Sequence, residues 1–166
     1  MDMDMDNSFR PFRTSDAEAL AALTLAAIRV TGLRAYTPEQ VAAWAARHPW
    51  AERFIASAAK GDTILVAVDA EDAPLAYALT EPDGHCDMLY CHPDFAGRGL
   101  ATALLAETEI CARAAQITCL FTEASELARP VFERAGYALL HRRDFAIAHG
   151  GQEIAIHNYA MEKRLR

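Results

Sequence analysis

The stretch HPDFAGRGLATALL, residues 92–105, places two glycines around an arginine directly before an alanine- and leucine-rich run. Residues 85–92 alternate in the manner of a β-strand, and residues 100 to about 115 have the apolar spacing of a helix. A loop that opens a helix presents unpaired backbone N–H groups, which bind anions. Gly97 and Gly99 permit unusual dihedral angles and Arg98 adds positive charge. The stretch matches neither the Walker loop nor GxGxxG, so it indicates an anion-binding loop or simply a tight strand-to-helix turn.

The amino-terminal part of the chain contains start and stop signals for three helices. After a short strand at 9–13, Ser15 and Glu18 form a capping box that predicts a helix to about residue 30, ended by Gly32. Thr37 and Gln40 repeat the box, with proline between them, and predict a second helix to about residue 47. A third helix is expected at 50–60.

Strands dominate the rest of the chain. We expect them at 63–68, 74–80, 85–92 and 117–122, followed by a hairpin of 137–149 and 152–161 around Gly150-Gly151. A helix is predicted from about 126 to 135, although Pro130 indicates that its regular part begins near that residue. The order of elements predicts one α/β (α+β) domain spanning 8–166, preceded by a disordered terminus at 1–7.

Composition excludes several classes of protein. The chain has 166 residues, of which 52% are hydrophobic and 23% charged, as in a globular domain. Its net charge of −7 argues against nucleic acid and weakly favours a cationic ligand such as an amine. Neither the four cysteines nor the six histidines have metal-site spacing, so we predict no metal. The absence of a secretory leader and of a membrane segment predicts reduced thiols, a cytoplasmic location and no membrane partner.

The glycine loop resembles the pyrophosphate-binding segment of the GNAT superfamily of acetyl-CoA-dependent N-acetyltransferases, in its bacterial form. That segment reads Val-x-Pro-x-x-[Gln/Arg]-x-x-Gly-x-[Gly/Ala]. Here Pro93, Gly99 and Ala101 match it, Cys91 replaces the valine, and Ala96 replaces the Gln/Arg. Ala96 lacks a side-chain donor, but the resemblance implies that backbone amides hold the pyrophosphate, so we expect cofactor binding to survive.

A second signature of the same family follows in order. EASELARPVFERAGY resembles its pattern of Ala, an aromatic residue, Lys/Arg, Gly and Phe/Tyr, here Ala128, Phe132, Arg134, Gly136 and Tyr137. The closing HNYAMEKRL is similar to the last strand of a bacterial subgroup, so the resemblance covers nearly the whole chain. It implies a central mixed, mostly antiparallel sheet of six to seven strands, flanked by helices and splayed at the acetyl-CoA site.

The resemblance also implies which residues form the site. Acetyl-CoA is the expected cosubstrate, with the backbone of Leu89 to Cys91 along the pantetheine arm and one N–H stabilising the oxyanion. The implied contacts to acetyl-CoA are Leu89, Tyr90, Cys91, Ala96, Gly97, Arg98, Gly99, Leu100, Ala101, Thr102, Ser125, Arg129, Phe132 and Arg134. For the acceptor, the family uses the region between the first two helices, which contains Tyr36 and Trp44. Both aromatic residues are equally compatible with core packing.

Catalysis requires a base, since an amine near pKa ~10.4 is protonated at neutral pH. The resemblance places this base at His85, and Asp87 points to the same strand face, so either residue is a candidate. Phe132 stands where many family members have a tyrosine that protonates the departing thiolate. A thiolate of pKa ~8.5 is a tolerable leaving group, so water or another side chain would suffice.

Three hypotheses follow. The first is an N-acetyltransferase that moves acetyl from acetyl-CoA directly to a primary amine of a small molecule or peptide in a ternary complex. The second, suggested by Phe132, is a non-catalytic acyl-CoA-binding module, and the third is an interaction protein that uses the fold as a scaffold. The acceptor's identity and the oligomeric state, including a homodimer, are left open.

Overall fold

A computed structural model describes residues 7–48 and 50–166 of the chain. The terminus predicted to be disordered lies, apart from its last residue, outside the described residues. One seven-stranded sheet organises the molecule, in the order β1-β2-β3-β4-β5-β7-β6. Its strands are β1 (Ser8–Pro11), β2 (Thr63–Val68), β3 (Pro74–Thr80), β4 (His85–Cys91), β5 (Cys119–Ala124), β6 (Ala138–His149) and β7 (Gln152–Arg164). Among the strands of the described residues, only β4 and β5 pair in parallel, which confirms the predicted mixed, mostly antiparallel sheet.

Helices pack on both faces of this sheet. The α-helices are α1 (Ala17–Ala26), α2 (Pro38–Ala45), α3 (Ala51–Ala59), α4 (Leu100–Ala114) and α5 (Arg129–Arg134). Short 3-10 turns are η1 (Thr14–Asp16), η3 (Gly32–Arg34) and η4 (Pro93–Phe95), and η2 (Ala27–Thr31) is a π-helical segment. None of the helices in the described ranges has the length and apolar content needed to cross a membrane.

Side chains of the central strands point alternately to the two faces of the sheet, and each face packs against its own apolar layer. Val66 and Tyr77 face α1 and α3, where Leu20 and Phe54 complete a buried cluster. The opposite side chains, among them Ala67, Ala76 and Ala78, pack against Leu100 and Leu104 of α4. Small residues on this second face let α4 lie close to the sheet, which fixes the position of its amino-terminal loop.

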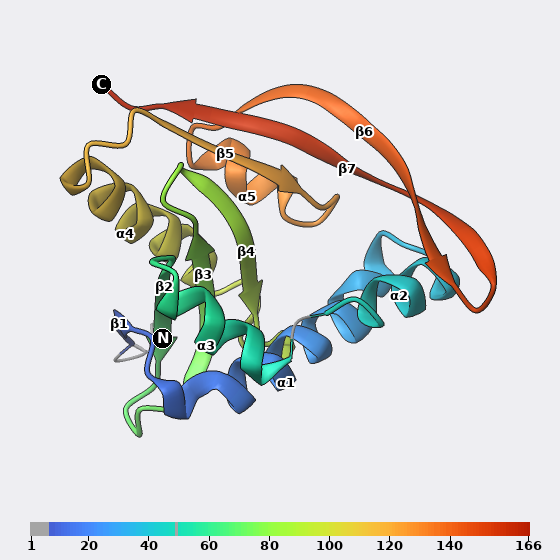
Figure 1. Cartoon of the computed structure of the whole chain (residues 1–166), viewed down its shortest axis with the longest axis horizontal. Coiled ribbons are helices and arrows are strands. Elements are labelled where there is room, and N and C mark those ends of the chain that lie inside the picture. The colour runs from blue at the N-terminus through green and yellow to red at the C-terminus, as the bar shows by residue number, and fades with distance from the viewer. Residues whose placement is uncertain (1–6, 49) are drawn as a thin grey trace.

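The hairpin of β6 and β7 reaches past the rest of the sheet to α2 (Figure 1). Its turn is Gly150-Gly151, with φ angles of +59° and +75°, as the sequence predicts for a two-residue hairpin loop. Gln40 of α2 donates from Nε2 to the carbonyl of Ala155 at 2.9 Å. Ile147 and Ile156 are buried in a cluster with α2 residues. The hairpin and α2 thereby form one wall of the cavity described below.

Several predicted boundaries are confirmed. Thr37 accepts from the Gln40 N–H, and the Gln40 side chain accepts from the Thr37 N–H, so the second capping box exists and Pro38 starts α2. The helix α5 begins at Arg129, with Pro130 in its first turn, which agrees with the later of the two expected starts.

The Ser15 capping box is wrong. Asp16 takes that place, because its carboxylate accepts the Arg13 N–H at 2.8 Å and two bonds from Arg10 at 2.8 and 2.9 Å. A bidentate arginine pair is stronger than a serine cap, so it decides the local geometry. The end at Gly32 is also wrong, since the chain continues through η2 into η3 before Tyr36.

Candidate functional site

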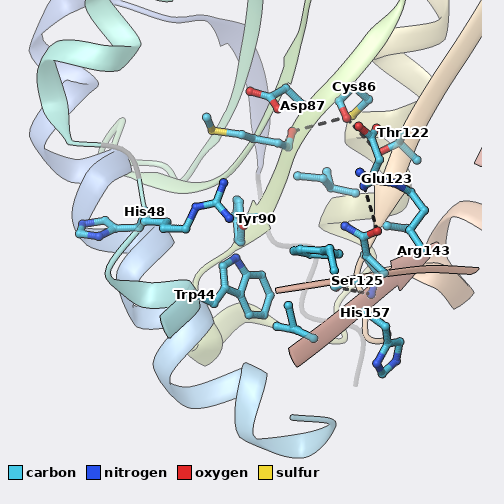
Figure 2. A pocket seen from close by; sticks show the side chains of 18 of the residues that line it. Trp44, His48, Cys86, Asp87, Tyr90, Thr122, Glu123, Ser125, Arg143 and His157 are labelled. Carbon is cyan, nitrogen blue, oxygen red and sulfur yellow. Dashed lines mark hydrogen bonds between the residues drawn. The ribbon is translucent and has the colours of Figure 1, made fainter. Parts of the chain in front are cut away.

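The parallel strands β4 and β5 pair over two positions only, His85 with Phe121 and Cys86 with Thr122. Beyond these positions the strands separate, and the Cys86 carbonyl is instead capped by the Thr122 hydroxyl at 2.9 Å. A cavity of about 440 Å³ occupies this opening (Figure 2). Its lining includes residues of α2, α3, β4, β5, α5, β6 and β7. The strand splay expected from the sequence is therefore the structural origin of this cavity.

The glycine loop lies at the carboxyl end of β4. Gly97 and Gly99 have φ angles of +77° and +84°, and Gly99 is the N-cap of α4. No described residue accepts a hydrogen bond from the backbone N–H groups of Gly97, Gly99, Leu100, Ala101 or Thr102. A Cβ on either glycine would meet nothing within 4 Å, so the loop is open to a ligand. Open N–H groups at the start of a 15-residue helix suit a phosphate.

His85 sits between two carboxylates. Its Nδ1 lies 2.6 Å from Glu81 Oε1, and its Nε2 lies 2.7 Å from Glu123 Oε2. The ring also stacks on Phe121, with centroids 5.0 Å apart. The bond to Glu123, more than the one to Glu81, raises the pKa of His85 from 6.5 to about 9, against the opposing effect of burial. At neutral pH His85 therefore carries a proton on both nitrogens and lacks the lone pair that a base requires.

Asp87 points from the same strand toward α3 and forms an ion pair with Arg53. Its Oδ2 accepts from Arg53 Nη2 at 2.9 Å, while its Oδ1 accepts no hydrogen bond within the described residues. Both residues line the cavity. Of the two candidate bases predicted from the sequence, Asp87 is thus the one with a free acceptor atom facing the open space.

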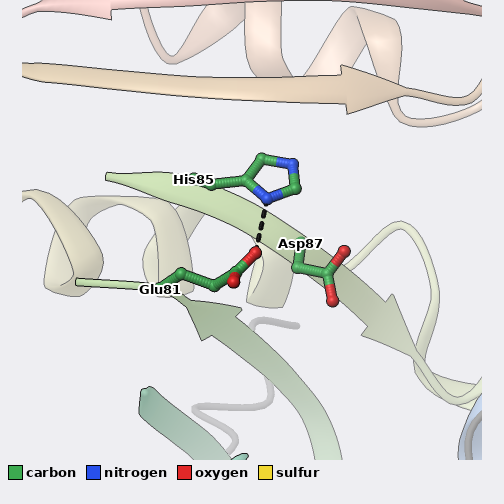
Figure 3. A group of neighbouring side chains, drawn as sticks. All are labelled: Glu81, His85 and Asp87. Carbon is green, nitrogen blue, oxygen red and sulfur yellow. Dashed lines mark hydrogen bonds and ion pairs between the residues drawn. The ribbon is translucent and has the colours of Figure 1, made fainter. Parts of the chain in front are cut away.

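Glu81, His85 and Asp87 also place their ligand atoms within 4.8 Å of one another (Figure 3). Such a group has the donor types of a metal site. However, both His85 nitrogens are engaged by carboxylates, which describes a histidinium held by ion pairs. The expectation of no metal stays a prediction.

Phe132 lines the cavity and is almost fully buried, with 2% of its surface exposed. Its ring packs edge-on against Tyr137 at 4.9 Å. The Tyr137 hydroxyl is buried without a hydrogen-bond partner among the described residues, and burial raises the pKa of that hydroxyl. Tyr137 does not line the cavity, so it does not supply the hydroxyl that Phe132 lacks. Ser125 does line it, with an Oγ that accepts the Ala128 N–H at 3.1 Å.

The other predicted cofactor contacts divide into two groups. Leu89 and Tyr90 line the cavity, whereas Cys91 and the loop from Ala96 to Thr102 lie outside its lining. Arg129 and Arg134 lie outside it as well. The Arg129 guanidinium is bonded to Glu133 at 2.7 Å and stacks over the Tyr159 ring at 4.5 Å. Arg129 is partly buried and Arg134 is exposed, and both belong to α5, whose Phe132 lines the cavity.

Tyr36 and Trp44 both line the cavity, as predicted for an acceptor site, and also pack on each other at 5.6 Å. The Tyr36 hydroxyl donates to the His157 carbonyl and accepts the Glu126 N–H, both at 2.9 Å. The His157 ring lies 2.6 Å from Glu126, which lowers the pKa of that carboxyl. Tyr36 therefore packs in the core and also lines the cavity, so the core role and the acceptor-site role expected for it are compatible.

Among the lining residues that were not predicted from the sequence are all three arginines of the cavity. Arg47, Arg53 and Arg143 all line the cavity, yet they come from three distant parts of the chain. No local motif joins them, because only the packing of α2, α3 and β6 around the splayed strands brings them together.

Comparisons with known proteins agree with this architecture. Residues 32–147 match the family model described as the Acetyltransferase (GNAT) domain. The uncharacterized N-acetyltransferase YafP of Escherichia coli (strain K12) is 29% identical over 135 residues, covering 77% of this chain and 79% of that protein. A solved GCN5-related N-acetyltransferase from Rhodopseudomonas palustris is 33% identical with a TM-score of 0.83, and 99% of each chain is covered. The PaiA N-acetyltransferase from Thermoplasma acidophilum, solved with coenzyme A, shares the fold at 15% identity, with a TM-score of 0.76 over 96% of this chain and 99% of that one.

Proposed function

The chain belongs to the GNAT family of acetyl-CoA-dependent N-acetyltransferases, and on this premise we propose that it moves the acetyl group directly to a primary amine of a small molecule or peptide. The observation that carries the proposal is the opening between β4 and β5, which joins a cavity to the strand that ends in the glycine loop. Cosubstrate and acceptor then meet at one strand edge, and no covalent enzyme intermediate is needed.

The glycine loop is the proposed pyrophosphate site. Five of its backbone N–H groups are available, and Gly97 and Gly99 leave the approach clear. The pantetheine arm is expected along β4 from Leu89 to Cys91, where the strand has no partner on β5. Backbone groups on that edge are free to bond the arm and the oxyanion of the tetrahedral intermediate.

For the chemical step, we assign the proton transfer to Asp87 rather than His85 at neutral pH. The neutral amine attacks the thioester carbonyl, a C–N bond forms, and the C–S bond breaks with the electron pair leaving on sulfur. Before the attack, Asp87 Oδ1, directly or through water, takes the proton that the ammonium must lose. The second proton, which the attacking nitrogen still carries once the C–N bond has formed, passes through water to the departing thiolate, which leaves as the free thiol. His85 is already charged and holds Glu81 and Glu123 in place, so it becomes a base only above pH ~9.

The decisive experiment measures thiol release from acetyl-CoA with a broad panel of amines, alongside calorimetry of acetyl-CoA binding. We expect turnover above the uncatalysed rate for at least one amine. D87N is expected to lower kcat about 10²-fold at neutral pH while the affinity for acetyl-CoA is unchanged. Unaltered kcat in D87N would remove Asp87 from the proton transfer.

The second candidate function is a non-catalytic acyl-CoA-binding module, favoured by the buried Phe132 ring where a proton donor is expected. Acetyl-CoA that binds but is never consumed would establish it. If acetyl-CoA fails even to raise the melting temperature, the fold serves only as an interaction scaffold.

A further inference from the structure

The acceptor side of the cavity is rich in positive charge, although the chain as a whole has a net charge of −7. Three arginines line it, Arg47, Arg53 and Arg143, against two carboxylates, Asp87 and Glu123. Local charge, and not the net charge of the chain, decides what a half-enclosed cavity attracts.

Both carboxylates are already matched by cations of the protein. Asp87 is bonded to Arg53 at 2.9 Å, and Glu123 is bonded to His85 at 2.7 Å. The pKa of Glu123 is lowered by that bond, so the carboxylate stays ionised and paired. Glu123 also interacts electrostatically with Arg143, whereas neither carboxylate forms a hydrogen bond with Arg47 or Arg143 among the described residues.

Neither of those two arginines forms an ion pair with a carboxylate within the described residues. Arg143 donates from Nη1 to the amide oxygen of Asn158 at 3.1 Å and lies 5.6 Å from the Phe145 ring centre, both uncharged partners. For the Arg47 side chain, the described part of the structure holds no ion pair and no hydrogen bond. Guanidinium groups bind carboxylates with paired, charge-assisted hydrogen bonds.

The two arginines approach the cavity from different walls. Figure 2 shows Trp44 and His48, which flank Arg47 in the sequence, on the α2 side, and Arg143 beside Glu123 on the opposite side. Between these walls the lining is largely aromatic and aliphatic, with Tyr36, Trp44, Tyr90, Phe145, Ile147 and Ile156. A ligand with an apolar body and an anionic end fits this arrangement.

The phosphates of acetyl-CoA do not account for these charges. The proposed pyrophosphate loop, residues 96–102, contributes nothing to the lining of this cavity. Arg47 and Arg143 are therefore available for the acceptor.

Resting on the proposed function, we propose that the acceptor is a small amine that carries a carboxylate near its amino group, and that this carboxylate is held by the positive charge that Arg47 and Arg143 bring to the cavity walls. The amine end then faces Asp87 and the open edge of β4, and the side chain of the acceptor packs on the aromatic lining. The substrate class is that of free amino acids.

The test compares amino acids with their carboxamides and with the corresponding amines that lack the carboxyl group. In the wild-type protein we expect the acids to have a kcat/KM at least about tenfold above the matched amides. R47Q and R143Q should each raise the KM for the acids and reduce this preference, with the KM for acetyl-CoA unchanged. R142Q is the matched control, because Arg142 is adjacent on β6, bonded to Asp144 and outside the cavity lining.

Each outcome either supports or refutes the proposed carboxylate site. Either of two results would refute the carboxylate site without contradicting the acetyltransferase function. The first is a preference for amides or decarboxylated amines, and the second is an acid preference that survives in the R47Q/R143Q double variant. If no amine releases thiol, the proposed function fails. Calorimetry with amino acids on the coenzyme A-saturated protein then tests the carboxylate site separately. Binding that is lost in the double variant supports the carboxylate site, whereas absence of binding refutes it.

Discussion

The ion-paired histidine makes a quantitative prediction about stability and pH. Replacing His85 with glutamine removes the cation between Glu81 and Glu123, which lie 2.6 and 2.7 Å from its ring nitrogens. The rise of the pKa of His85 from 6.5 to about 9 corresponds to at most about 3.4 kcal/mol of stabilisation. Glu81 and Glu123 are about one-third exposed, so solvent screening reduces the expected loss to about 1–2 kcal/mol.

The sign of the pH dependence is fixed by the direction of the shift. Because the folded protein holds the His85 proton more tightly than the unfolded chain, the stabilisation is complete below pH 6.5 and disappears as the pH rises through about 9. Urea unfolding of the wild-type protein and H85Q across this interval should give curves that differ most at the acidic end and converge at the alkaline end.

NMR titration of the His85 ring provides the independent check. E123Q, which removes the partner with the larger effect, should lower the pKa of His85 toward its ordinary value. Equal unfolding free energies of wild type and H85Q at acidic pH, or an unshifted ring titration in the wild type, would refute the ion-paired histidinium.

Two further predictions concern glycines. G84A should destabilise the fold by about 3 kcal/mol or more, since its Cβ would lie 2.2 Å from the Cys119 carbonyl oxygen at a φ of +99°. G61A is its control, with a similar φ of +103° and an open surrounding, and should cost only about 1 kcal/mol by urea unfolding. G99E should weaken acetyl-CoA binding in calorimetry, because a carboxylate would enter the proposed phosphate site. G151E, equally open at a φ of +75°, controls for backbone strain, and equal affinities of the two variants would contradict the placement.

The sequence predicts those parts of the fold that local chemistry determines. The Thr37 box, the Gly150-Gly151 turn and the glycine loop each satisfy backbone groups within a few residues, so their patterns are visible in the chain. Asp16 displaces Ser15 because its partner Arg10 comes from β1, outside the window of a capping motif. The π-helical η2 was missed because apolar spacing does not distinguish it from the end of an α-helix.

The candidate site, like the fold, could be predicted from the sequence only in part. His85 was predicted as a candidate base from the family resemblance and Asp87 from its place on the same strand face, but the chemical state of each depends on residues that only the fold brings near. The parallel register of β4 and β5 places Glu123 on the His85 ring, and α3 places Arg53 on Asp87. A histidine chosen for its near-neutral titration is in this way converted into a cation, which is why we propose its neighbour Asp87 for the proton transfer.

The charge of the cavity reverses an inference that composition suggests. A net charge of −7 favours a cationic partner, but three arginines and only two carboxylates line the cavity, and both carboxylates contact a cation of the protein. An amine that also carries a carboxylate satisfies both features, since its ammonium is drawn to the acidic surface and its carboxylate to the arginines. Binding the carboxylate would also hold the amino group near Asp87, so recognition and proton transfer would depend on the same orientation of the acceptor.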